Sequence, residues 1–167
     1  MGVVNTLSNL ITNADASPAV MSPPHLAHGR VRSAVATVET AAADDDGSVY
    51  RMVRLWSGWR VNRIDLLNDA ITSGTAYDVG IYQTAANGGA VVDDDVFATA
   101  VDLSSARVAP LDVLFEALNI DKIEKQLWEV LPGLTSDPGR WYDLCLTADT
   151  VGSAAGTISL RVEYVVD

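Results

Sequence analysis

Apolar and polar residues alternate in short runs along much of the chain, most clearly in VYRMVRLWSGWRVNRIDLLNDAITSGTAYDVGIYQ, residues 49–83. Successive side chains of a strand point to opposite faces of a sheet, so a period of two marks a strand with one buried side. The runs predict strands at 30–40, 49–56, 59–67, 76–83, 96–103, 141–148 and 157–166. About seven or eight strands separated by short turns are typical of an antiparallel β-sandwich or barrel. We therefore expect an all-β domain.

One region follows a helical period instead. Apolar residues recur there at the i, i+3, i+4, i+7 spacing in two sets: Leu111, Leu114, Phe115 and Leu118, then Ile123, Leu127 and Val130. Asp121 and Glu124 have the spacing of a capping box that would begin the second helix, and Pro132 with Gly133 would end it. The pattern predicts one short helical insertion, at about 111–131, that covers an open face or end of the sheets.

The first 29 residues differ from the rest of the chain. Three prolines in this segment resist both helix and central strand, because proline fixes φ and lacks an amide donor. We interpret residues 1–29 as an extended N-terminal arm and 30–167 as the sandwich domain. Residues 3–11 form either a short helix or a disordered tail. An arm with this many apolar residues is expected to lie on a partner, through Val20, Met21, Pro23, Pro24 and Leu26.

Charge narrows the choice of partners. The net charge is −11, of which residues 1–83 contribute −2, from six Arg and eight acids, and residues 84–167 contribute −9, from five basic residues and fourteen acids. Such a surface repels phosphate, so we expect no nucleic-acid partner unless basic residues gather in a patch. No stretch has the length of a membrane-spanning helix, and the N-terminus lacks the positive start of a signal peptide. We therefore expect a protein used in solution, with no membrane partner.

Two sets of residues near the clearest alternation are candidates for contacts with a partner. Four arginines on adjacent predicted strands form either a docking patch for an acidic partner or separate, ion-paired surface charges: Arg51, Arg54, Arg60 and Arg63. Trp56 and Trp59 flank a Ser-Gly turn, so they either reach the rim, where they can anchor an interface, or fill the core.

Residues for catalysis or metal binding are scarce. One Cys and two His are too few for a zinc site or a cupin-type centre, and neither a G-x-S-x-G motif nor a phosphate-binding glycine motif occurs. Two aspartate runs, Asp44–Asp46 and Asp93–Asp95, either bind calcium or are solvated turn charges, since they lack spaced ligands. Cys145 lies in an apolar run typical of a buried free thiol. We therefore expect no enzyme activity, no metal and no cofactor.

Two motifs follow one predicted strand pair: LNDAI, at Leu67–Ile71, and TAYDVGIY, at Thr75–Tyr82. The stretch that contains them, about a quarter of the chain, resembles small head proteins of tailed bacteriophages. The resemblance implies a jelly-roll cement or decoration protein, which binds the outside of the capsid and ties neighbouring major capsid subunits together. It implies a structural virion protein, made in the host cytoplasm, that meets the major capsid protein as a homo-oligomer, either a dimer or a trimer. The arm and the insertion lie outside the matched stretch.

Two other functions are compatible with the same residues. A carbohydrate-binding jelly roll, as in an adhesin, would use Trp56, Trp59 and Tyr50 as a platform for sugar rings and an aspartate run to hold calcium. A hydrolase with divergent motifs is the third reading. Binding to glycans would favour the first of these, whereas co-sedimentation with assembled shells would favour the cement function.

Overall fold

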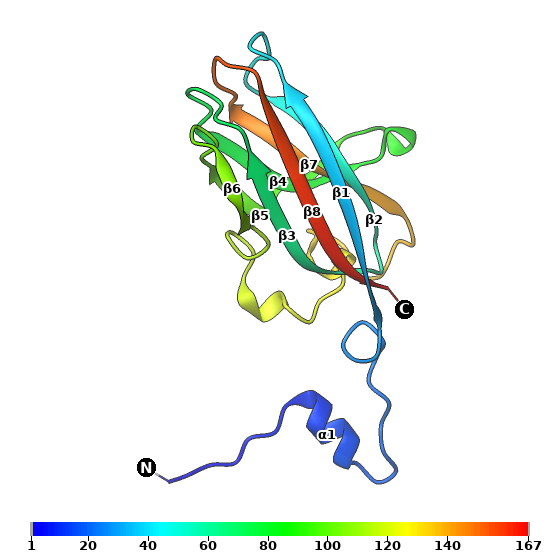
Figure 1. Ribbon diagram of the computed structural model, residues 1–167. Helices are drawn as coiled ribbons and strands as arrows, with labels where there is room; N and C mark the ends of the chain where they lie inside the picture. Colours follow the sequence, from blue (N-terminus) through cyan, green and yellow to red (C-terminus); the bar gives the residue numbers. More distant parts are fainter. Residues whose placement is uncertain (1, 167) are drawn as a thin grey trace.

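Eight antiparallel strands form two four-stranded sheets in the computed structural model, which describes residues 2–166 (Figure 1). One sheet has the order β1 (Arg30–Thr40), β8 (Gly156–Val166), β3 (Arg60–Asn68) and β6 (Arg107–Asp112). The other has the order β2 (Ser48–Trp56), β7 (Trp141–Thr150), β4 (Ala76–Gln83) and β5 (Val91–Val101). Every connection except β4–β5 passes from one sheet to the other, which is the arrangement of a jelly roll. The predicted all-β antiparallel sandwich is confirmed.

The core lies between the two sheets, where alternate residues of each strand point inward. Ile64 and Leu66 of β3 and Leu144 and Leu146 of β7 are fully buried there. Apolar residues therefore alternate along the strands because each strand turns one side toward the opposite sheet.

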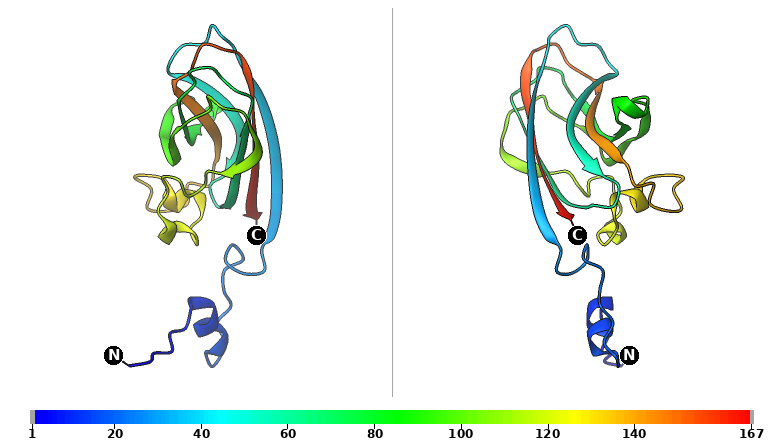
Figure 2. Two further views of the ribbon diagram at one scale, coloured as in Figure 1. Left: turned by 60° about the vertical axis from the view of Figure 1, so that its left-hand side comes forward. Right: turned by 90° about the vertical axis from the view of Figure 1, so that its right-hand side faces the viewer.

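The predicted short helical insertion is present as two short pieces, in the second half of the predicted range. Residues 111–112 belong to strand β6, and helical structure is limited to the 3₁₀ turn η2 (Ile120–Lys122) and the single-turn helix α2 (Leu127–Val130). The capping box is formed by Gln126 and Glu129 rather than by the predicted pair. Of the apolar residues that suggested a helix, all but the exposed Ile123 still pack on the core, because the loop covers an open end of the sandwich (Figure 2).

One strand was not predicted, and another begins earlier than predicted. Strand β6 was not expected, and β5 begins at Val91, so that Asp93–Asp95 lie within a strand rather than in a loop. The β5 main chain passes directly over Gly80 of β4, where an added Cβ would overlap the backbone of Asp94. Only glycine leaves room for this close approach of the two main chains.

Residues 2–29 lie outside both sheets and extend from the end of the sandwich where β1 begins (Figures 1 and 2). Their one helix is α1 (Asn9–Asp15), which begins after Ser8, whose side chain accepts a hydrogen bond from the amide of Ile11. A further 3₁₀ turn, η1 (Ala85–Asn87), joins β4 to β5. No helix in residues 2–166 is long and apolar enough to span a membrane.

Candidate interaction surfaces

The arm presents large apolar side chains to solvent. None of the residues of α1 is buried, and Val3, Val4 and Met21 are 106%, 81% and 92% exposed. The exposed set among residues 2–29 also includes Leu7, Leu10, Ile11 and Val20. Exposed apolar side chains concentrated in one segment mark a surface that can bind a partner.

The base of the arm, in contrast, is held against the domain. The amides of Leu26 and Ala27 donate to the carbonyl of Pro23, and the guanidinium of Arg60 donates to the carbonyl of His25 at 2.7 Å. Leu26 is half-buried and lines a hollow of about 210 Å³ shared with the domain. Of the predicted contacts, Val20, Met21, Pro23 and Pro24 are therefore exposed, whereas Leu26 packs on its own chain.

The four predicted arginines do not form one patch. Arg51 and Arg54 project from β2 and both donate to the carboxylate of Asp143 on β7, at 2.9 and 2.8 Å. Arg60 and Arg63 belong to β3, which lies in the other sheet. Strands β2 and β3 are adjacent in sequence, but the turn between them crosses from one sheet to the other, so the two pairs face different sides of the sandwich.

Arg63 forms part of a charged cluster on the outer face of the first sheet. It donates to Asp65 at 2.6 Å, and Arg161 of β8 donates to the other oxygen of the same carboxylate. The side chain of Asp65 is fully buried beneath these two guanidinium groups. Burial alone would raise the pKa of Asp65, but the hydrogen bonds and charges of the arginines outweigh it and lower the pKa below its usual value.

Three tryptophans and a tyrosine gather at the end of the sandwich that bears the arm. Trp59 stacks on Tyr164 with ring centres 4.4 Å apart, and the ring of Trp141 meets both Trp56 and Trp59 edge to face at 5.1 and 5.2 Å. Trp141 is 42% exposed. Mutual stacking covers one face of Trp59, so this cluster is only partly open to a partner.

The sugar-binding platform proposed from the sequence does not form. Tyr50 lies near the other end of β2 from Trp56, is 9% exposed, and donates its hydroxyl to Asp44 at 2.7 Å. Its ring stacks on Tyr77 within the core. Tyr50 is therefore a core residue and cannot join Trp56 and Trp59 in a common surface.

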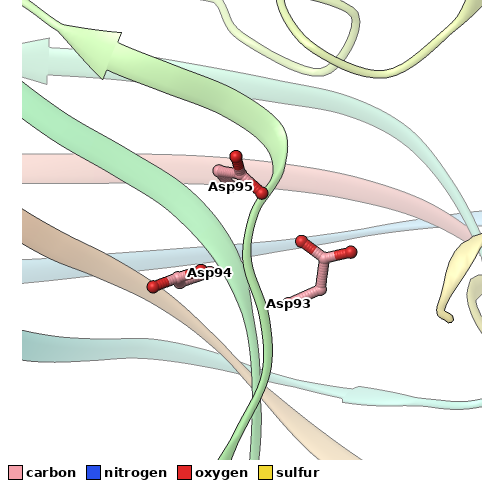
Figure 3. Close-up of side chains that lie close together, drawn as sticks. All are labelled: Asp93, Asp94 and Asp95. Carbon is pink, nitrogen blue, oxygen red and sulfur yellow. The ribbon is translucent and has the colours of Figure 1, made fainter.

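The aspartate runs occupy two different settings. Asp44 accepts hydrogen bonds from the amide of Ala41 and from Tyr50, which lower its pKa and fix the β1–β2 turn. The carboxylates of Asp93, Asp94 and Asp95 lie within 4.8 Å of one another, with Asp94 turned away from Asp93 (Figure 3). Burial and the neighbouring carboxylate of Asp95 raise the pKa of Asp93. All three come from consecutive residues of one strand, and no ligand from another element of residues 2–166 completes the group.

Cys145 is a buried free thiol, as expected from its apolar surroundings. Burial raises the pKa of Cys145 to about 12, and the nearby Asp143 acts in the same direction. The thiolate is the nucleophilic form, so this sulfur is unreactive at neutral pH. The residue is part of the fold rather than a chemical site.

Comparison with known proteins gives a likeness of fold. No family model and no curated protein matches the chain. Among solved structures, a chain in the structure titled "Capsid of Ralstonia phage GP4" is 15% identical, with a TM-score of 0.61 over 83% of this chain and 86% of that one. A chain in "Cyanophage Pam1 capsid asymmetric unit" is 14% identical, with a TM-score of 0.51 over the full length of both. Both are likenesses of fold, and the second covers the whole of this chain, including the segment that forms the arm.

Proposed function

We propose that this chain is a structural component of a bacteriophage capsid, which binds the outside of the shell and ties neighbouring major capsid subunits together through its N-terminal arm. The observation that carries the proposal is the arm itself: seven large apolar side chains within residues 3–21 are exposed next to a complete sandwich core. An apolar segment of this kind is expected to gain its stability on a partner.

The likeness to chains in two phage capsid structures supports the choice of partner, although it is a likeness of fold. Charge supports the outer side of the shell. A chain with a net charge of −11 is repelled by packaged DNA, whereas the outer surface carries no such penalty. The resemblance of residues 47–84 to head proteins points to the same function.

The binding energy of this arrangement comes from apolar burial. Each Val, Leu, Ile or Met side chain moved from water into a contact contributes about 1.5–3 kcal/mol. The cost of ordering the arm and of bringing two molecules together reduces the total, so a single copy binds with modest affinity. Many copies on one shell raise the effective concentration of each remaining contact, and weak single contacts then give a stable lattice.

Co-sedimentation with empty heads of the phage that encodes the chain tests the proposal. The full chain is expected to sediment with the heads, and a variant that lacks residues 2–29 is expected to stay in the supernatant while circular dichroism shows an intact β-domain. Met21→Asp is expected to weaken attachment at least tenfold, because about 1.4 kcal/mol corresponds to a factor of ten. Val108→Asp is the matched control, since Val108 is also 92% exposed but lies on β6.

Full attachment without the arm would reject the arm as the binding element. A full chain that does not bind heads at all would reject the capsid function. Binding to a glycan array with no binding to heads would favour the carbohydrate-binding alternative instead.

A further inference from the structure

The free edge of β1 differs from the other three sheet edges. A strand at an edge presents unpaired amide and carbonyl groups, and proteins normally block such edges with prolines, bulges, charges or short strands. β6 has six residues and contains Pro110, β2 is interrupted by a bulge after Arg51, and β5 has repeated irregularities beside its three aspartates. Each of these edges is therefore protected against pairing.

β1 has none of these protections along its centre. It pairs with β8 over eleven residues without a shift in register, whereas every other strand pair within residues 2–166 has at least one. On its outer side, Val31 and Val35 are 60% and 71% exposed. No hydrogen bond from the described residues reaches the unpaired side of its main chain. This edge is long, regular and apolar, which are the properties of a template for a further strand.

We infer that the β1 edge pairs with the β1 edge of a second copy of this chain, antiparallel and centred on Val35. The β1-β8-β3-β6 sheets of the two copies then join into a single eight-stranded sheet. In this register all eleven residues of each strand pair. Val35 meets Val35 of the second copy, Ser33 meets Thr37, and Ala34 meets Ala36. Small and β-branched residues in direct opposition allow close approach and favourable cross-strand contacts.

The distribution of charge lets a second copy of this acidic chain approach β1 without opposing acids along the centre of the strand. β1 has no acid between residues 30 and 38, although the chain as a whole is strongly acidic. Its two arginines, Arg30 and Arg32, lie at one end and its one acid, Glu39, lies at the other. In this register Glu39 of each strand lies opposite Val31 of the other, while Arg30 and Arg32 lie opposite Thr40 and Val38 on the other face of the sheet. The contact is the same from both sides, as a two-fold axis requires.

The pairing has a geometric consequence for the arm. Each arm joins its domain at Arg30, the first residue of β1 (Figure 1). Because the paired strands run in opposite directions, the two arms leave the dimer at opposite ends. The dimer does not depend on the proposed capsid function, since it concerns the free chain in solution.

Light scattering and sedimentation equilibrium of the free chain measure the pairing directly. The expected mass is twice the 17.7 kDa of one chain. Val35→Lys places two like charges opposite each other at the centre and is expected to raise the dimer dissociation constant by about tenfold or more. Val108→Lys on the edge strand β6 is the matched control and is expected to leave the mass unchanged.

Disulfide trapping tests the register. Val35→Cys is expected to form a covalent dimer on mild oxidation, because residue 35 lies opposite its own copy. Val31→Cys and Val108→Cys are expected to form no covalent dimer. Circular dichroism checks that each variant is folded. A single-chain or three-chain mass at about 100 μM would overturn the inference, as would a dimer that persists in Val35→Lys. Efficient trapping at residue 31 or 108 rather than 35 would overturn the register.

Discussion

Replacing Asp65 with Asn measures how much the charged cluster of Arg63, Asp65 and Arg161, on the outer face of the β1-β8-β3-β6 sheet, stabilises the fold. The carboxylate is fully buried, and both of its oxygens accept hydrogen bonds from Arg63 and Arg161. The amide of Asn keeps the shape and one acceptor oxygen but turns an N–H group toward one of the guanidinium groups. The variant therefore loses one charged hydrogen bond and the attraction of the negative charge, with little change in volume.

The exposure of the two arginines sets the size of the effect. Breaking a buried ion pair costs about 3–5 kcal/mol when it leaves a buried charge behind, and a hydrogen bond to a charged group contributes about 1.5–3 kcal/mol. The side chains of Arg63 and Arg161 are 44% and 46% exposed, so water solvates them once Asp65 is neutral. We expect the free energy of unfolding to fall by about 2–3 kcal/mol, and the melting temperature by about 4–12 °C.

The dependence on pH gives an independent check. The pKa of Asp65 is lower in the folded chain than in the unfolded one, so its contribution is complete above the unfolded value of about 4 and disappears as pH falls through the folded value. Urea unfolding of both proteins from pH 7 to pH 3 is expected to show a constant difference that shrinks below about pH 4. Asp121→Asn, an exposed control, is expected to change stability by less than about 0.5 kcal/mol. This reasoning would be refuted if the free energies of unfolding of the chain and of Asp65→Asn differed by less than about 0.5 kcal/mol at pH 7, or if their difference stayed constant down to pH 3.

Three further outcomes follow from the packing of the second sheet. Gly80→Ala is expected to lower the free energy of unfolding in urea by at least about 2 kcal/mol, because the added methyl overlaps the main chain at Asp94; an unchanged midpoint would contradict that crossing. The thiol of Cys145, whose pKa is raised to about 12, is expected to react with a disulfide reagent at pH 8 only after denaturation, and rapid reaction of the folded chain would show that it is accessible. Burial raises the pKa of Tyr77 to about 12, so Tyr77 is expected to stay un-ionised at pH 10. Ultraviolet titration of the chain and of Tyr77→Phe is therefore expected to show the same tyrosinate absorbance at that pH.

The alternation of apolar residues predicted most strands of the sandwich because burial on one side of a sheet is a local property of each strand. It did not predict β6, in which Val108, Ala109 and Pro110 are all exposed and leave no period to detect. The helical spacing after Leu111 was misleading for a related reason. A loop that covers the end of a sandwich also points every third or fourth residue inward, and only hydrogen bonding distinguishes it from a helix.

The candidate surfaces were harder to predict than the strands. Period two does not say which sheet a strand joins, so four arginines on adjacent strands were expected together but lie as pairs on different sheets. The exposed apolar residues of the arm, such as Met21, were recognisable because prolines separate them from any strand. The edge of β1 had no signal in the sequence, because only the topology shows which strands lie at the edges.

The position of the arm at one end of the sandwich has a practical consequence for the other end. The β1–β2 and β7–β8 connections lie at the end opposite the arm (Figure 1), and residues 41–43 between β1 and β2 are exposed. A foreign peptide inserted there would point away from any surface that the arm grips. Such an insertion would leave in place Asp46, whose carboxylate accepts a hydrogen bond from the amide of Val151 and so ties this loop to the β7–β8 connection. For the attachment through the arm proposed above, the fold thus offers a site that can carry an antigen or an enzyme on the side away from the arm.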